Sequence, residues 1–198
     1  MNSSDEPEPA RSLGFPARRT TAEPLLASAP QLIRRQRRIS ADWREVAAFL
    51  NVIPAALARS PYSVCLLSDR AIRRYNEQFR KKDEATDVLS FPMGRGASGE
   101  SEYLGDILIS VEMAQRNASR FGVRLEDEIK ALILHGLLHL RGQDHESDSG
   151  QMARNERRWG ARLGLPQTLL GKKRQAQSAA PVSLRSRSLR ASRHGQLR

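Results

Sequence analysis

Three of the four histidines of this 198-residue chain fall within eleven residues, in the stretch HGLLHLRGQDH at positions 135–145. His135 and His139 are four residues apart, so on a helix they project from one face, one turn above the other. Gly142 allows a sharp turn after the helix, which lets His145 fold back toward the first two. Three imidazoles that converge from one side, with the fourth direction open, are typical of a catalytic zinc site. The stretch therefore predicts a Zn²⁺ site with these three histidines as ligands.

Burial makes this interpretation more specific. A buried imidazole is costly unless its nitrogens are satisfied, and one shared cation satisfies all three rings together. Asp144 is a candidate to orient one ligand by a hydrogen bond. The competing interpretation is that each histidine is only packed or hydrogen-bonded, but three within eleven residues favour a metal. His194, near the end of the chain, is expected to be solvated and unrelated to the site.

The spacing H-x3-H-x2-G-x2-H is shared by the metzincin metalloproteases, which need a Glu directly after the first His as their general base. Here that position is Gly136. The motif supplies the metal ligands and lacks the base of the peptidase, which leaves a protease as the weaker alternative.

The elements that position these residues predict an α+β domain. The run IKALILHGLLHL carries His135 and His139 and is apolar on nearly all sides, so it predicts a central, covered helix. Helical periodicity predicts further helices with N-caps at Ser40 and Asp69, and two more at about 111–120 and 149–163. Four stretches, QLIRRQRRI, YSVCLL, TDVLSF and YLGDILISV, predict strands. The expected fold is a small mixed β-sheet of about four strands packed with helices around the central apolar helix that carries the two histidines.

Composition divides the chain into three parts. Five of the ten prolines fall in residues 1–30, which predicts a disordered leader. Residues 171–198 carry eight Lys or Arg and no acid, so they hold most of the net charge of +11, and residues 1–170 carry only +3. We expect a disordered basic tail that either attracts polyanions or only keeps the protein soluble. The domain is expected over residues 31–170, and a second basic cluster, RRQRR at 34–38, lies inside it.

The compartment is expected to be the cytoplasm. Cys65 is the only cysteine, so no disulfide can form within the chain, and we expect it to be a buried, unreactive thiol. No run reaches the roughly 18 apolar residues of a membrane span. The acids near the start argue against a secretory signal or a transit peptide.

Three segments, in order, resemble the YbeY endoribonuclease family. HGLLHLRGQDH matches its HGxLHLxGyDH signature, YNEQFRKKDEATDVLSFP is similar to LNxxyRxkdxpTDVLSFP, and LGDILIS is similar to LGDIxIs. The resemblance covers about residues 40–165. Gln143 stands where the family usually has an aromatic residue and Ala85 where it usually has Pro, and neither departure removes a metal ligand.

The resemblance implies a zinc-dependent, single-strand-specific endoribonuclease that acts in ribosomal RNA processing, at the 3′ end of the small-subunit rRNA, and in ribosome quality control. It implies one Zn²⁺ per chain on His135, His139 and His145, and Arg80 as the catalytic arginine. The implied partners are single-stranded RNA, ribosomal RNA, the ribosome and small-subunit ribosomal proteins, without a membrane.

The residues around Arg80 fit that role. Arg80 begins RKKDEATD, where the pattern changes from helix to loop, and its planar guanidinium suits phosphate oxygens. Lys81 and Lys82 are candidates for flanking phosphates. Asp87 and Asp106 lie in apolar strands, and we expect each to accept structural hydrogen bonds rather than to act as the general base.

An alternative from another class is an RNA-binding ribosome-assembly factor whose zinc is structural. Structural zinc normally has four protein ligands, often cysteines, whereas only three ligands are evident here. The ligand set therefore favours the enzyme.

Overall fold

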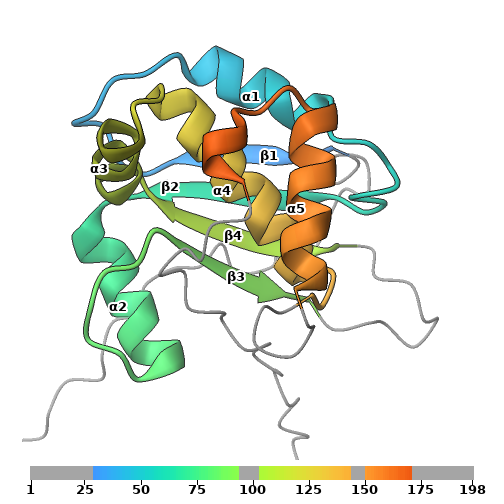
Figure 1. Cartoon of the computed structure of the whole chain (residues 1–198). Helices are drawn as coiled ribbons and strands as arrows, with labels where there is room; N and C mark the ends of the chain where they lie inside the picture. Colours follow the sequence, from blue (N-terminus) through green and yellow to red (C-terminus); the bar gives the residue numbers. More distant parts are fainter. Residues whose placement is uncertain (1–28, 94–102, 144–149, 171–198) are drawn as a thin grey trace, which may run out of the picture.

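The structure, a computed structural model, describes residues 29–93, 103–143 and 150–170 (Figure 1). It consists of one four-stranded sheet with helices on both faces. The elements are β1 (Gln31–Arg34), α1 (Trp43–Asn51), β2 (Tyr62–Leu67), α2 (Asp69–Arg80), β3 (Val88–Pro92), β4 (Gly105–Ser110), α3 (Val111–Phe121), α4 (Leu125–Leu140), α5 (Gln151–Arg162) and a 3-10 turn (Gln167–Leu169). The predicted α+β class, with a small mixed sheet around a central apolar helix, is confirmed.

The sheet has the order β1-β2-β4-β3. Strands β1, β2 and β4 are parallel, and β3 runs antiparallel to β4 at one edge. Ser90 of β3 pairs with Ile107 of β4, and Phe91 pairs with Asp106. Because successive side chains of a strand point to opposite faces, Ser90 and Phe91 face opposite layers of the molecule.

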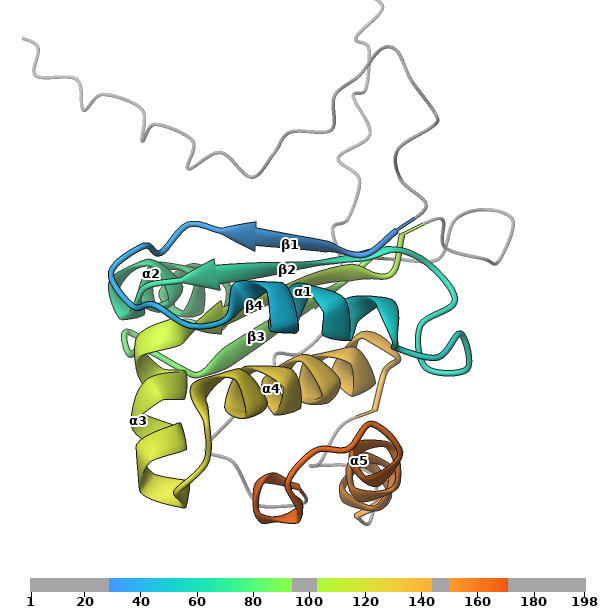
Figure 2. The same ribbon diagram turned by 90° about the horizontal axis from the view of Figure 1, so that it is seen from above.

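The two faces of the sheet are covered unequally. Helices α1, α3 and α4 lie on one face with α5 outside α4, whereas α2 alone lies on the other face (Figures 1 and 2). The larger core lies on the first face, between the sheet and α4. A smaller cluster of Leu67, Ile72, Leu89 and Leu108 lies under α2.

Helix α4 is enclosed between the sheet and α5 (Figure 2). Every residue from Ala131 to Leu140 is buried, which confirms the covered central helix that the apolar run predicts. Within the described ranges, no helix combines the length and the hydropathy of a membrane span.

Several predicted boundaries were wrong by one to five residues. Asp42, not Ser40, caps α1, because its carboxylate accepts from the backbone N–H groups of Arg44 and Glu45. Ser68, not Asp69, caps α2. The third strand begins at Val88 rather than Thr86.

The first strand ends at Arg34, whereas the predicted strand QLIRRQRRI continues for five more residues. The N–H groups of Arg35 and Gln36 both donate to the carbonyl of Leu66, at 2.9 and 3.1 Å. Two donors on one acceptor break the regular ladder, and the chain then leaves the sheet.

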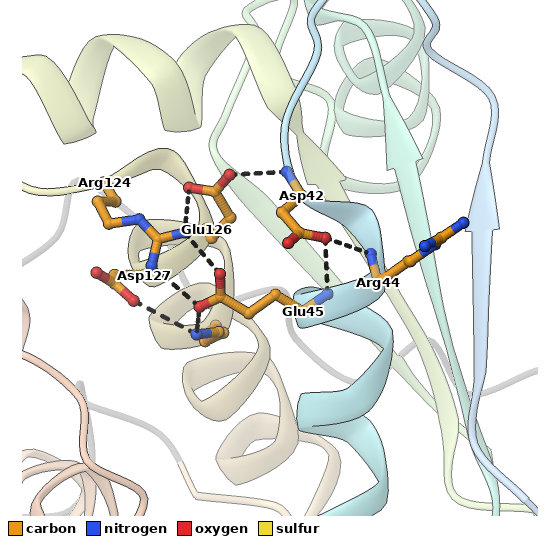
Figure 3. Close-up of polar contacts among 7 residues, drawn as sticks. Asp42, Arg44, Glu45, Arg124, Glu126 and Asp127 are labelled. Atoms are coloured by element: carbon orange, nitrogen blue, oxygen red, sulfur yellow. Dashed lines mark hydrogen bonds and ion pairs between the residues drawn. The ribbon is translucent and has the colours of Figure 1, made fainter.

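A cluster of charged residues joins α1 to the N-terminal end of α4 (Figure 3). Arg124 donates to both oxygens of the Glu45 carboxylate, at 2.6 and 3.2 Å, and Lys130 donates to one of them. The backbone N–H of Asp42 donates to Glu126 at 2.8 Å. Hydrogen bonds from Arg124 and then Lys130 lower the pKa of Glu45 to about 2. These contacts fix the end of α4 that lies farther from the histidines.

The lowered pKa predicts a pH dependence of stability. A carboxyl group with a folded-state pKa of about 2, against an ordinary 4.5, stabilises the fold above pH 4.5, and this stabilisation is lost as the pH falls toward 2. Glu45→Gln should lower Tm by a few degrees at neutral pH and flatten the fall of Tm between about pH 4.5 and 2. Glu77→Gln, at an exposed residue of α2, is the control. Equal effects of the two substitutions, in thermal melts followed by circular dichroism, would contradict a specific role for Glu45.

Candidate metal centre

His135 and His139 lie one turn apart on α4 and face each other. Their Nε2 atoms are 3.1 Å apart, and their ring centroids are 4.7 Å apart with an angle of 71° between the planes. His135 is 1% and His139 8% exposed. The two predicted ligands from α4 are therefore buried, with their Nε2 atoms turned toward one point.

Glu156 of α5 contacts the imidazole of His135. Its carboxylate oxygen Oε1 lies 3.3 Å from Nδ1 of the imidazole, and Glu156 is fully buried. A carboxylate accepts a hydrogen bond, so Nδ1 is the donor in this contact and Nε2 is the nitrogen that faces His139. A carboxylate in this position orients a histidine that binds a metal through Nε2.

The separation of the two nitrogens fits a metal site. Two nitrogens at 2.0–2.1 Å from a tetrahedral Zn²⁺ ion lie about 3.3 Å apart, close to the 3.1 Å between these Nε2 atoms. Among the described residues, no group of three or more His, Cys, Asp or Glu side chains is placed to hold a metal. The third predicted ligand, His145, lies outside the described residues, as does Asp144.

Gly136 lets α4 approach the sheet between the two histidines. A Cβ atom at this position would lie 2.7 Å from Cγ2 of Ile107 and 3.1 Å from Oγ of Ser90. The Ser90 hydroxyl donates to the Gly136 carbonyl at 3.3 Å. A metzincin would carry its glutamate here, and the packing leaves no room for that side chain, which is a second argument against the protease.

The chain turns sharply at the end of α4, as predicted. Gly142 has a φ of +79°, and its N–H donates to the His139 carbonyl at 2.8 Å. Gln143, where the family has an aromatic residue, accepts a hydrogen bond from Asn155 of α5 at 3.1 Å. This bond ties the turn to the helix that carries Glu156.

Arg80 is the last residue of α2, at the predicted change from helix to loop. Lys81 follows in the left-handed conformation with a φ of +60°, which costs a non-glycine residue about 1 kcal/mol. Two contacts hold the loop beyond it: Arg73 binds Asp83 through two hydrogen bonds of 2.6 Å, and Asn76 donates to the Glu84 carbonyl at 2.8 Å. The position of Arg80 is therefore set by a strained and tightly bonded turn.

Arg80 and the histidines flank opposite faces of β3. Phe79, beside Arg80, packs edge-on against Phe91 with a centroid distance of 5.1 Å. Ser90, the preceding residue of β3, bonds to Gly136 between the two histidines. β3 is an edge strand whose outer edge is not paired within the described sheet, so the helix of the histidines and the helix that ends at Arg80 meet the same sheet edge from its two faces.

The two acids of the predicted strands, Asp87 directly before β3 and Asp106 within β4, accept hydrogen bonds, as expected. Asp87 accepts from the Val88 N–H at 2.9 Å and, more weakly, from Thr86 at 3.4 Å. Asp106 accepts from Ser63 and, at 2.6 Å, from Tyr103. Cys65 is partly buried beside the small cluster under α2, and burial raises the pKa of its thiol, which argues against a nucleophile.

The sequence of this chain matches the model of one protein family over most of the described fold. The model of endoribonuclease YbeY matches residues 33–164, about two thirds of the chain. The chain belongs to the YbeY endoribonuclease family. A YbeY protein is an RNA-cleaving hydrolase, and the family is one of metalloenzymes.

Individual YbeY proteins are similar over the same region. The endoribonuclease YbeY of Solibacter usitatus is 50% identical over 111 residues, 56% of this chain and 71% of that protein. That of Nautilia profundicola is 44% identical over 121 residues, 61% of this chain and 85% of that protein. The solution structure of TM1509 from Thermotoga maritima aligns with 68% of this chain and 88% of its own at 23% identity, with a TM-score of 0.49.

Glu156 is a buried polar neighbour of the candidate site that the sequence pattern did not single out. The signal was present, because Glu156 follows Met152 by four residues and precedes Trp159 by three, on the apolar face of α5. A carboxylate on a buried helical face needs a partner, and that partner is His135 of the YbeY signature.

Glu156→Gln should weaken metal binding without unfolding the protein. The amide keeps the volume of the side chain but removes the charge that orients His135, so affinity for Zn²⁺ as the probe ion should fall about 10- to 100-fold. Competition with a chromophoric chelator measures this affinity. Glu128→Gln is the matched control, because Glu128 is also fully buried but lies two turns before His135 on α4. An equal loss of affinity in both variants would show that Glu156 has no specific role.

Proposed function

We propose that the protein is a zinc-dependent, single-strand-specific endoribonuclease that matures ribosomal RNA at the 3′ end of the small-subunit rRNA and takes part in ribosome quality control. The observation that carries the metal assignment is the convergence of the His135 and His139 Nε2 atoms to 3.1 Å in a buried position. His145, from the same family signature, would complete a ligand set of three.

Zinc is the metal that this ligand set favours. Neutral imidazole nitrogens suit a borderline cation such as Zn²⁺ better than the hard ion Mg²⁺, which prefers oxygen. A zinc ion on three protein ligands keeps one position open and acts as a Lewis acid toward water and phosphate oxygens. The contact of Glu156 with His135 would orient the imidazole toward the ion.

Arg80 is proposed to bind the phosphate that is cleaved. Its guanidinium offers parallel donors to two phosphate oxygens, and it stabilises the negative charge that grows on them during cleavage. The bonded turn after α2 holds the backbone of Arg80 in place before substrate arrives. Lys81 and Lys82 are proposed to bind the neighbouring phosphates.

The edge position of β3 supports a preference for single strands. The histidines lie on one face of β3 and Arg80 follows a residue that packs on the other. For groups from both faces to contact one phosphate, that phosphate must lie at the edge of the strand. A single strand bends to bring a phosphate there more easily than a duplex, whose backbones are held apart by base pairs.

The proposed partners are single-stranded RNA, ribosomal RNA, the ribosome and small-subunit ribosomal proteins, and the proposed compartment is the cytoplasm. Residues 31–170 are proposed to be the catalytic domain. The proposed leader, 1–30, and basic tail, 171–198, lie almost entirely outside the described residues. The eight positive charges of the tail would add affinity for RNA.

His139→Ala tests the metal. About one zinc per chain should copurify with the wild type, and the variant should lose it because one of two converging ring nitrogens is gone. Elemental analysis of both proteins gives the measurement, and undiminished zinc in the variant would overturn the site.

Arg80→Ala tests the phosphate contact separately from the metal. Zinc content and Tm should stay unchanged, whereas cleavage of a defined single-stranded RNA should fall about 100- to 1000-fold, the scale for one charge-stabilising donor. Arg157→Ala, at an exposed residue of α5, is the control. A matched duplex should resist cleavage by the wild type. Unchanged cleavage by Arg80→Ala, or equal cleavage of the duplex, would contradict the proposal.

A further inference from the structure

The basic segment at residues 34–38, RRQRR, is not explained by the metal centre or by Arg80. Its four arginines are exposed, and none forms an ion pair with a carboxylate in the described part of the chain. Arg34 lies over the ring of Trp43 at 5.0 Å, which leaves Arg35, Arg37 and Arg38 as three charges directed to solvent.

The backbone of this segment is fixed, unlike that of a flexible tail. The Leu66 carbonyl holds the N–H groups of both Arg35 and Gln36. The side chain of Gln36 is only 5% exposed, so it anchors the segment between its exposed neighbours.

The Gln36 amide has no hydrogen-bond partner within the described part of the chain. Its nitrogen and oxygen are both buried. A buried polar group without partners costs about 1–3 kcal/mol. Such a cost is more typical of binding sites than of structural positions.

The segment lies beside α2, the helix that ends at Arg80. Both views place the chain after β1 next to the beginning of α2 (Figures 1 and 2). The Leu66 carbonyl that binds Arg35 and Gln36 lies two residues before Ser68, the N-cap of α2. Arg70 and Arg74 of α2 are also exposed. From its first turn to Arg80 the helix spans about 18 Å.

We propose that residues 34–38 form a docking site for the phosphate backbone of single-stranded RNA, outside the cleavage site and connected to it along the exposed face of α2. Arg35, Arg37 and Arg38 contact phosphates, which gives affinity without sequence preference. This inference rests on the proposed function, because it takes RNA as the substrate. An RNA long enough to reach both sites binds more tightly than one that covers the cleavage site alone.

The test removes three charges from the segment. In the variant Arg35→Gln/Arg37→Gln/Arg38→Gln, the Kd for a single-stranded 20-mer, measured by fluorescence anisotropy with EDTA, should rise at least tenfold near 0.1 M salt. The slope of log affinity against log salt should decrease by about 2, because each lost contact on a single strand contributes about 0.7. The variant Arg35→Lys/Arg37→Lys/Arg38→Lys should keep most of the slope, since it keeps the charges.

Cleavage kinetics separate this site from the catalytic centre. The glutamine variant should raise KM for the 20-mer with kcat unchanged, and should cut a pentanucleotide, too short to span both sites, as the wild type does. The control Arg59→Gln/Arg120→Gln/Arg157→Gln removes the same charge from exposed positions elsewhere and should change Kd less than about twofold. An unchanged Kd, or an equal loss in the control, would overturn the docking site. A wild type that cuts neither RNA would instead overturn the proposed function.

Discussion

From Ala131 to Leu140 every residue of α4 is buried, so each polar group on that part of the helix needs a partner inside the protein. The histidines satisfy this requirement with each other and with Glu156. The surroundings of the helix meet this requirement. Gly136 allows close contact with the sheet, and α5 supplies the carboxylate of Glu156. The charged cluster of Glu45 binds the other end of α4. A polar centre enclosed by apolar packing is held in place by the packing, and the carboxylate orients one of its imidazoles.

The elements were largely predictable from the sequence, and the contacts between them were not. The apolar run around His135 predicts a buried helix because an amphipathic pattern is absent, and this is a local property. The end of β1 depends on two donors that share the Leu66 carbonyl, which no local pattern indicates. Glu156 lies 21 residues from His135, and only the packing of α5 on α4 brings them together. The family motifs single out Arg80, but its relation to the histidines needed the register of β3.

Strand β3 lies between the helix that carries His135 and His139 and the helix that ends at Arg80. Ser90 and Phe91 are neighbours in sequence and face opposite layers, so one holds the histidine helix and the other holds the arginine helix. The side chains of β3 alternate between its two faces, so this one strand contacts both α4 and α2. It thereby positions His135 relative to the helix that ends at Arg80, about 55 residues earlier in the chain. Residues on both sides of an edge can act on one flexible polymer, which is a reason for an active site to form at the margin of a sheet rather than at its centre.

The dependence of His135 on α5 also bears on the order in which the protein matures. A chain emerges from its N-terminus, and domains begin to form as their segments become available. The sheet and α4 are complete once residue 140 has appeared, whereas the carboxylate partner follows on the last long helix of the described fold. A shortened chain that ends before α5 would hold a nearly buried imidazole without its acceptor. Formation of the centre is thereby coupled to completion of the chain, because α5 supplies both this acceptor and Met152, which packs in the core with α4.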